Sequence, residues 1–278
     1  MKIVHSVQAM VALREEIPRP LGLVPTMGYL HQGHLGLVRR AKLDNDTVIV
    51  SIFVNPTQFG PNEDYGSYPR DLASDMALLE EEGVDLVFAP SAEDMYPFGF
   101  DTSVDVGRVA RPLEGMARPG HFLGVTTVVT KLFTMFRPDR AYFGQKDGQQ
   151  VMVIKALNVD LNLGVEVLVL PTVRETNGLA MSSRNVHLTS EERQAAGVLY
   201  QALCKAMDLW SHGERYAPTL RYAVGKLIEE EPLASLEYVS VADAQTLQEL
   251  TVVENSCMVS VAVRFGVARL IDNVILGD

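Results

Sequence analysis

The first 170 residues alternate short apolar runs with longer amphipathic stretches, and this alternation limits the chain to few folds. The apolar runs are rich in β-branched residues and lie at residues 21–25, 48–54, 85–89 and 165–170. Strands that are apolar on both sides must be covered on both faces, as in a parallel sheet. Amphipathic stretches such as 35–44 and 68–82 can supply the covering helices. We therefore expect an α/β fold, a Rossmann-like parallel sheet with helices on both faces.

Local signals refine this expectation. Asp71 and Ser74 suit the positive end of the second helix, and Gly83 is a good stop for it. Residues 97–122 are rich in Gly, Pro and Arg and are poorly periodic, which indicates a long surface excursion. An apolar helix is expected after that excursion, at residues 124–136.

The character of the sequence changes after Arg184. Thr189 is placed to cap a helix that runs to about residue 212, with Glu192 three residues further on. Alternating apolar residues at 237–241, 258–265 and 268–271 are typical of a small antiparallel sheet. We therefore expect two domains, a Rossmann-like domain at residues 1–184 and a smaller α+β domain at residues 185–278.

Charge and cysteine usage exclude several classes of protein. The 24 Lys and Arg residues stand against 35 Asp and Glu, a net charge of −11, which disfavours a nucleic-acid-binding surface but allows a local basic pocket. The two cysteines, Cys204 and Cys257, form no CxxC pair, which favours free thiols in a reducing compartment over a disulfide. The N-terminus has no long apolar region, and no apolar run reaches the roughly 18 residues of a membrane span. A cytoplasmic protein without a membrane partner is expected.

The densest functional motif follows the first apolar run, at residues 25–34. A glycine-bearing turn delivers His31 and His34 to the start of a helix, on one side of a helical turn. Backbone N–H groups and the helix dipole favour an anion there, so the motif fits a polyphosphate. Neither a Walker sequence nor GxGxxG occurs, and no HExxH or cysteine partner supports zinc. The alternative is a capped helix with two surface histidines.

Two later segments carry groups that bind phosphate. After Gly178, the hydroxyls of Ser182 and Ser183 and the guanidinium of Arg184 could wrap phosphate oxygens. On its own, however, an SSR tripeptide is usually a solvated loop or a helix cap. In the segment YFGQKD, Gly144 permits close approach of a nucleotide.

Within the same segment, Lys146 could supply a positive charge to a phosphate, and Asp147 could accept from ribose hydroxyls. A turn with a Lys–Asp surface pair is the alternative. Gln58 and Gln150 carry neutral amides at expected strand ends, where they could hold hydroxyls and a carboxylate.

These segments, in this order, resemble the pantothenate synthetase family. PTMGYLHQGH resembles that family's version of the HIGH signature of nucleotidyl-transferring Rossmann enzymes, and MSSRN resembles its counterpart of the KMSKS loop. FVNPTQFGPNEDY, RPGHFLGVTTVVTKLF and YFGQKD complete the set, while the C-terminal part carries a weaker resemblance. The resemblance implies an ATP-dependent ligase that condenses (R)-pantoate with β-alanine through a pantoyl-adenylate, releasing AMP and pyrophosphate.

The resemblance also implies roles for individual residues, a lid-like C-terminal domain and a homodimer. Mg²⁺ is expected on the triphosphate without dedicated protein ligands. Pantoate is assigned to Gln58 and Gln150, with Gln58 also near β-alanine. The implied catalytic residues are His34, His31, Lys146, Ser182, Ser183 and Arg184. The implied ATP-binding residues are Met27, Gly28, Tyr29, Leu30, His31, Gln32, Gly33, His34, Gly144, Gln145, Lys146, Asp147, the backbone at Val173, Met181, Ser182, Ser183 and Arg184.

Two departures from the family pattern affect the expected stiffness of loops. Gly148 stands where the family often has an aromatic residue, and Asn177 where Asp commonly precedes the glycine. Three rival functions remain open. A nucleotidylyltransferase would not need the paired glutamines, and an aminoacyl-tRNA synthetase would need a basic surface. A nucleotide sensor would bind ATP without exchanging pyrophosphate, and the pairing of HQGH with MSSR disfavours it.

Overall fold

The computed structural model describes residues 1–61 and 63–277 and forms two compact units. Unit 1 comprises Met1–Gly144 and Gln150–Leu170, and unit 2 comprises Gln145–Gln149 and the described part of Pro171–Asp278. Asn62, in the motif FVNPTQFGPNEDY, and Asp278, in the expected second domain, lie outside the described residues. The domain boundary after residue 184 remains a proposal.

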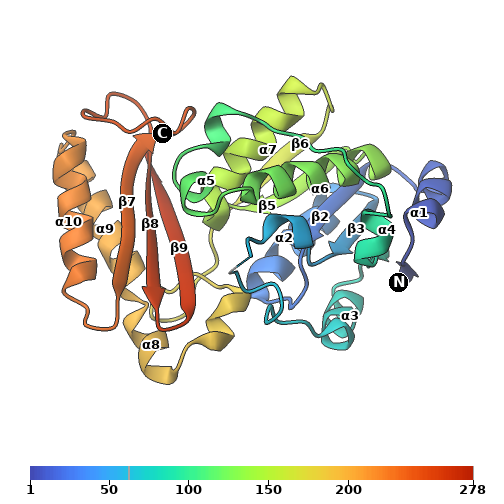
Figure 1. Cartoon of the computed structure of the whole chain (residues 1–278), viewed down its shortest axis with the longest axis horizontal. Coiled ribbons are helices and arrows are strands. Elements are labelled where there is room, and N and C mark those ends of the chain that lie inside the picture. Colours follow the sequence, from blue (N-terminus) through green and yellow to red (C-terminus); the bar gives the residue numbers. More distant parts are fainter. Residues whose placement is uncertain (62, 278) are drawn as a thin grey trace. The chain divides into compact units, whose positions relative to one another are not determined.

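Unit 1 is built on a six-stranded parallel sheet with the order β1-β4-β3-β2-β5-β6. Figure 1 labels β2, β3, β5 and β6 of this sheet. Its strands are β1 (Lys2–Val4), β2 (Leu21–Thr26), β3 (Thr47–Ile52), β4 (Leu86–Phe88), β5 (Arg140–Gly144) and β6 (Glu166–Leu170). The four expected strands are present, and β1 and β5 are additions that the sequence did not predict. The expected α/β class is therefore confirmed.

Helices cover both faces of this sheet because successive strand residues point to opposite sides. On one face, Leu23 and Phe88 pack with α1 (Val7–Leu13), α6 (His121–Phe136) and α7 (Gly148–Asp160). On the other face, Val24 and Tyr142 pack with α2 (Gln32–Asp44) and α3 (Leu72–Glu81). The short helices of unit 1 are η1 (Arg14–Glu16), η2 (Pro56–Gln58), α4 (Ala92–Met95), η3 (Arg108–Ala110) and α5 (Glu114–Ala117). The short helix η4 (Gln145–Asp147) belongs to unit 2.

The strand order reverses at β2. From β2 the chain moves outward to β3 and β4, and it later returns to the other side of β2 as β5 and β6. In the register between β2 and β5, Gly22 pairs with Arg140 and Leu23 pairs with Ala141. This pairing stops before the carboxyl end of either strand. Such a reversal is the place where open α/β sheets bind ligands. The motif at residues 25–34 leaves β2 at this point.

The expected helices are present with altered starts. The helix expected at 35–44 begins three residues earlier, at Gln32, because His31 caps it. The helix expected at 68–82 begins at Leu72, capped by the side chain of Asp71, and ends before Gly83, whose φ is 68°. The region 97–122 is mostly irregular, with η3 and α5 in it, and α6 begins at His121.

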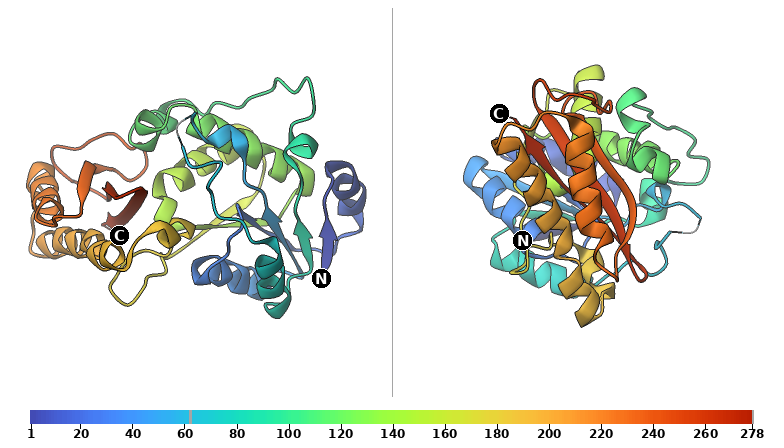
Figure 2. Two further views of the ribbon diagram at one scale, coloured as in Figure 1. Left: turned by 60° about the horizontal axis from the view of Figure 1, so that its bottom comes forward. Right: turned by 90° about the vertical axis from the view of Figure 1, so that its left-hand side faces the viewer.

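Unit 2 contains a three-stranded antiparallel sheet covered by two helices. The strands are β7 (Ser235–Asp243), β8 (Cys257–Phe265) and β9 (Ala268–Leu276), in that order. The helices α9 (Val198–Ser211) and α10 (Ala217–Glu229) bury their apolar sides against the sheet, as the right-hand view of Figure 2 shows. The segment before them holds η5 (Ser183–His187) and α8 (Ser190–Ala195). The expected α+β fold of the smaller C-terminal part is therefore confirmed.

The single helix expected from Thr189 to about residue 212 is wrong, because the structure has α8 and α9 there. The capping box is present, with Glu192 N donating to Thr189 Oγ1 over 3.2 Å and Thr189 N donating to Glu192 Oε2 over 2.9 Å. The helix breaks at Gly197, where an added Cβ would lie 2.8 Å from the carbonyl oxygen of Asn177. A distant loop therefore occupies the space that a continuous helix bearing side chains would need.

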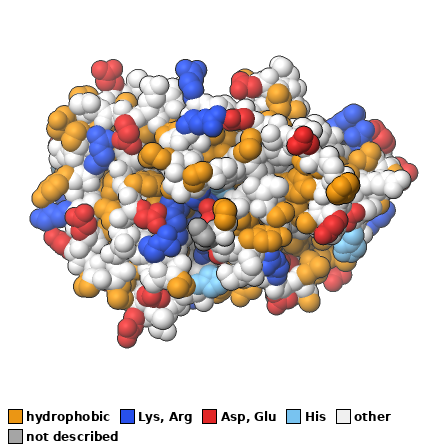
Figure 3. All heavy atoms as spheres, viewed as in Figure 1, with side chains coloured by type: hydrophobic (Ala, Val, Ile, Leu, Met, Phe, Trp, Pro, Cys, Tyr) orange, Lys and Arg blue, Asp and Glu red, His pale blue; other side chains and the backbone are white. Residues whose placement is uncertain are grey.

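Both cysteines are free thiols, so the disulfide alternative is wrong. Burial raises the pKa of Cys257 to about 11, which keeps that thiol protonated and unreactive at neutral pH. Among the described residues, no helix combines the length and the apolar character that crossing a membrane requires. On the face drawn in Figure 3, basic and acidic side chains are interspersed with apolar ones.

Candidate active site

The turn after β2 has a backbone that requires glycine. Gly28 has φ 80° and Tyr29 has φ 50°, and Gly28 N donates to Thr26 Oγ1 over 3.1 Å. A Cβ on Gly28 would lie 2.9 Å from Asp75 Oδ2 and 3.0 Å from Ile52 Cγ2. Glycine is thus needed both for its left-handed conformation and for the close approach of α3.

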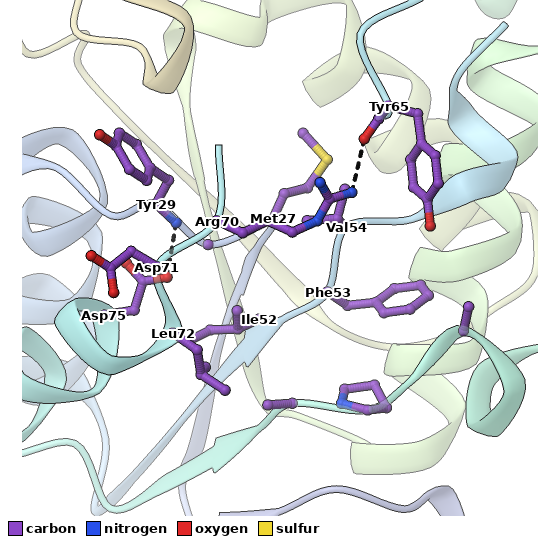
Figure 4. A pocket seen from close by; sticks show the side chains of 14 residues that line it. Met27, Tyr29, Ile52, Phe53, Val54, Tyr65, Arg70, Asp71, Leu72 and Asp75 are labelled. Atoms are coloured by element: carbon purple, nitrogen blue, oxygen red, sulfur yellow. Dashed lines mark hydrogen bonds between the residues drawn. The ribbon is translucent and has the colours of Figure 1, made fainter. Parts of the chain in front are cut away.

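A buried carboxylate holds this turn. Asp75, in the first turn of α3, accepts from Tyr29 N over 2.8 Å (Figure 4). It also accepts from Leu30 N over 2.7 Å. Burial raises the pKa of Asp75, and the two backbone hydrogen bonds oppose that rise. Asp75 was not predicted from the sequence. The available signal was an acidic residue one turn after the Asp71 cap, within a helix that must pack on the sheet.

The two predicted histidines cap α2. His31 is the N-cap residue, and its Nδ1 accepts from Gly33 N over 3.1 Å. His34 Nδ1 accepts from His31 N over 3.3 Å, and the two rings lie 4.0 Å apart. Because a backbone N–H can only donate, each Nδ1 carries a lone pair. A neutral imidazole in this arrangement bears its proton on Nε2.

This cap combines two features of an anion site. The N-terminus of a 13-residue helix supplies a positive dipole end, and the imidazoles add Nε2–H donors beside it. The alternative reading, a helix capped by histidines, is therefore correct for Nδ1, since this nitrogen of each ring accepts a backbone hydrogen bond of the cap. Nε2 is then the nitrogen that bears the proton of each neutral ring.

Gln58 presents hydrogen-bond donors next to the same turn. The residue is 8% exposed, and its side-chain Nε2 donates to Met27 Sδ over 3.0 Å. Its Oε1 accepts from Asn55 Nδ2, at 3.1 Å. Asn55 is itself oriented by the backbone, since its Oδ1 accepts from Thr57 N and its Nδ2 donates to Gly124 O. The N–H groups of Gln58 therefore face Met27, and a substrate there must offer an acceptor.

Helix α6 fixes the position of η2, the short helix that carries Gln58. His121 Nδ1 donates to Gln58 O over 2.9 Å, and Arg118 Nη1 lies 3.2 Å from His121 Nε2. Burial and then the Arg118 charge lower the pKa of His121 to about 4, so its imidazole is neutral near pH 7. A Cβ on Gly124 would lie 2.4 Å from Thr57 O, so α6 and the backbone of η2 are in close contact.

A cavity of about 240 Å³ lies beyond the carboxyl ends of β2, β3 and β4 (Figure 4). The predicted residues Met27, Gly28 and Tyr29 line it, together with the apolar Phe53. Arg70, which was not predicted from the sequence, also lines it and donates to the carbonyls of Tyr65 and Tyr68. The carboxyl edge of the sheet is thus hollowed next to the predicted motif.

Unit 2 carries the predicted residues around Lys146. Lys146 Nζ lies 3.3 Å from Asp147 Oδ1, so the Lys–Asp pair considered as an alternative is present. Asn273 Nδ2 donates to the carbonyls of Gln145 and Lys146. At Gly148, an added Cβ would lie 2.7 Å from Met258 Sδ, so a side chain of this protein fills that space.

The second predicted segment of unit 2 is a hairpin that leads into η5. Val173 O accepts from Met181 N over 2.9 Å, and Ser182 Oγ accepts from Arg184 N over 3.3 Å. Ser183 is 6% exposed. Asn177 donates to Arg193 O and accepts from Leu179 N, and an aspartate could make the second of these bonds but not the first.

The predicted site residues divide between the two units. Unit 1 holds Met27, Gly28, Tyr29, Leu30, His31, Gln32, Gly33, His34, Gln58, Gly144 and Gln150. Unit 2 holds Gln145, Lys146, Asp147, Val173, Met181, Ser182, Ser183 and Arg184. Within unit 1, the structure brings His31 and His34 together and places Gln58 against Met27.

Comparison with known proteins identifies relatives over the whole chain. A family model described as pantoate-beta-alanine ligase matches residues 2–275. A pantothenate synthetase from Roseiflexus sp. (strain RS-1) is 57% identical over 276 residues, which cover 99% of both chains. The crystal structure of pantothenate synthetase from Thermus thermophilus has a TM-score of 0.94 at 47% identity, covering 99% of both chains. The pantoate-beta-alanine ligase from Francisella tularensis, complexed with beta-gamma ATP and beta-alanine, has a TM-score of 0.81 at 38% identity, covering 99% of this chain and 97% of that chain.

Proposed function

This chain belongs to the pantoate-beta-alanine ligase family, and we propose that it condenses (R)-pantoate with β-alanine at the expense of ATP, through a pantoyl-adenylate. The products are pantothenate, AMP and pyrophosphate. The observation that carries the proposal is the paired-histidine cap of α2 at the point where the strand order reverses. The Francisella relative, whose structure holds beta-gamma ATP and β-alanine, supports two of the three substrates.

The chemistry explains why donors are needed. A carboxylate does not acylate an amine directly, because oxide is a poor leaving group. Attack of the pantoate carboxylate on the α-phosphorus of ATP forms a mixed anhydride and expels pyrophosphate. The amine of β-alanine then attacks the activated carbonyl, and AMP leaves. Negative charge grows on the α-phosphate and on the pyrophosphate, so positioned donors lower the barrier.

We assign the phosphate contacts of the first step to the residues that the family resemblance implies. His31 and His34 donate through Nε2, whose protonation follows from the bonds at Nδ1. Lys146 supplies a positive charge, and Ser182, Ser183 and Arg184 supply further donors. The resemblance to the family supports these roles, with His34 as the principal catalytic residue.

Pantoate is assigned to Gln58 and Gln150. The orientation of the Gln58 amide supports this, because its N–H groups suit a carboxylate or hydroxyl oxygen and its Oε1 is already bonded to Asn55. Met27 beside it offers an apolar surface for the methyl groups of pantoate. Gln150 lies in the first turn of α7 and is partly exposed.

Mg²⁺ is proposed as a companion of ATP that neutralises phosphate charge. Among the residues described, no group of three or more His, Cys, Asp or Glu side chains is arranged to hold a metal ion. The nearest carboxylate of the turn, Asp75, already accepts two backbone N–H bonds. These residues fit an ion carried mainly by phosphate oxygens and water.

A homodimer is also proposed, on the strength of the family resemblance. A cytoplasmic location is proposed because free thiols without a CxxC pair suit a reducing compartment. Sedimentation velocity at micromolar concentration tests the assembly. A species of twice the mass of the 278-residue chain is expected, and a monomer would refute the dimer.

The decisive test of the reaction is pantoate-dependent exchange of labelled pyrophosphate into ATP without β-alanine. Exchange is expected because the adenylate forms before the amine is required. A requirement for β-alanine would refute the two-step scheme. Exchange that is independent of pantoate would instead indicate a nucleotidylyltransferase, and binding of ATP without exchange would indicate a sensor.

A further inference from the structure

We propose that Asp272 and Asn273, consecutive residues of β9, are positioning residues for ATP. They hold two segments of unit 2, the Gln145–Lys146 turn and the hairpin before Met181. This inference rests on the proposed function, which assigns phosphate contacts to both segments. It goes beyond that function because neither residue belongs to the predicted site.

Asn273 holds the turn that carries Lys146. Its side chain is buried, and its Nδ2 donates to Gln145 O over 2.9 Å and to Lys146 O over 2.8 Å. Its Oδ1 accepts from Gln145 Nε2 over 2.8 Å. Because backbone carbonyls can only accept, the orientation of the Asn273 amide is fixed. One side chain thus makes three hydrogen bonds to two consecutive residues.

Close packing reinforces these bonds. A Cβ on Gly148, directly after η4, would lie 3.0 Å from Asn273 Oδ1. The turn therefore has little room to shift toward β9. Since the backbone of Lys146 sets the origin of its side chain, Asn273 determines where the ammonium group can reach.

Asp272 holds the second segment through Arg174. The Asp272 side chain is 1% exposed and accepts from Arg174 Nη1 over 2.5 Å and from Nη2 over 3.1 Å. Arg174 also donates to Gly178 O, and its guanidinium lies 3.7 Å from the centre of the Tyr200 ring. A bidentate, buried pair of this kind fixes direction as well as distance.

Arg174 lies at the base of the hairpin that leads to the phosphate loop. It forms an antiparallel bridge with Ala180, and the next residue, Met181, donates from its N to Val173 O. Asp272 therefore sets the point from which Met181–Arg184 departs. Burying Asp272 and Asn273 costs free energy of desolvation, which their hydrogen bonds to these two segments offset.

The test uses variants of Asn273 in the full-length chain. Asn273→Ala removes all three bonds, and Asn273→Asp keeps the volume but loses both donors. Ser260→Ala is the matched control, since Ser260 is buried opposite Asn273 on β8 and its Oγ has no partner in the described structure. Steady-state kinetics with varied ATP and with varied pantoate, beside a thermal melt, give the readout.

We expect the two Asn273 variants to raise KM for ATP about tenfold, which corresponds to about 1.4 kcal/mol. KM for pantoate at saturating ATP should stay within about twofold. Asp272→Asn should also raise KM for ATP, because a neutral amide cannot replace the charged bidentate pair with Arg174. Ser260→Ala should behave as the wild type.

A double-mutant cycle with Lys146→Ala shows whether Asn273 acts through that turn. In the Lys146→Ala background, Asn273→Ala should change the single-turnover rate of adenylate formation less than about threefold. If the two residues acted independently, the rate loss of the double variant would be the product of the two single losses. An unchanged KM for ATP, or equal losses for all substrates, would overturn the inference. Failure of both Asn273 variants to fold would overturn it too. A wild-type chain that forms no pantothenate would instead refute the proposed function.

Discussion

Replacing His34 separates its two roles, because the structure places them on different nitrogens. Nδ1 accepts from His31 N in the cap of α2, and Nε2 is the proposed donor to phosphate. His34→Ala removes both atoms. His34→Gln restores an acceptor at the third helical position, where glutamine completes a capping box, but it does not restore the imidazole.

The magnitudes follow from the geometry. The Nδ1 bond is long, at 3.3 Å, and it is one of several at the cap, so losing it should cost about 0.5–1 kcal/mol of the free energy of unfolding. Losing one preorganised transition-state donor should slow adenylate formation by about 10²–10³-fold. His34→Gln should recover most of the stability and little of the rate.

Single-turnover adenylation and urea unfolding, both measured on each variant, test this reasoning. A folded His34→Ala enzyme that forms the adenylate at a near-normal rate would leave His34 as a capping residue only. Recovery of both rate and stability in His34→Gln would show that the rate loss came from the cap.

Three further predictions concern the surroundings of Gln58. Since the folded protein holds the pKa of His121 at about 4 against an ordinary 6.5, its contribution to stability is complete above pH 6.5 and falls as the pH drops toward 4. The loss should reach roughly 3 kcal/mol, and urea unfolding at several pH values should show a shallower decline for His121→Gln. Gly124→Ala should destabilise by about 2 kcal/mol or more and raise KM for pantoate, since its Cβ would meet Thr57 O at 2.4 Å; normal kinetics and melting would contradict that packing. Gln58→Glu should raise KM for pantoate at least about tenfold by repelling its carboxylate, with KM for ATP as the internal control.

The regular elements could be predicted where their signals are local. Residues 48–54 are almost wholly β-branched or apolar, and they form β3 within two residues of the expected ends. β5, with the sequence RAYFG, is short and mixed, so periodicity did not distinguish it from a turn. The break between α8 and α9 depends on Asn177 approaching Gly197, a contact that no local pattern encodes.

The residues of the candidate site also differ in whether a local sequence signal could predict them. His31 and His34 were predictable because their spacing alone places them on one turn of a helix. Asp75 lies 46 residues from Tyr29, and Asn273 lies 128 residues from Gln145. Asp75 is one of several polar residues in α3, and Asn273 follows another polar residue in β9, so the local sequence marks neither as a contact. The partner of each is known only once the chain has folded, so sequence reasoning proposed groups to contact a ligand and missed those that hold them.

The two readings of the histidine motif turn out to describe one geometry. A histidine used only as a cap could be replaced by Ser, Thr, Asp or Asn, which satisfy the backbone better. Capping through Nδ1, however, fixes the tautomer and the plane of each ring, so each Nε2–H is directed before any ligand arrives. A donor fixed in this way needs no reorganisation as charge develops on phosphate. The capping bonds are therefore part of the proposed catalytic arrangement, and a helix start that looks merely structural is what orients the donors.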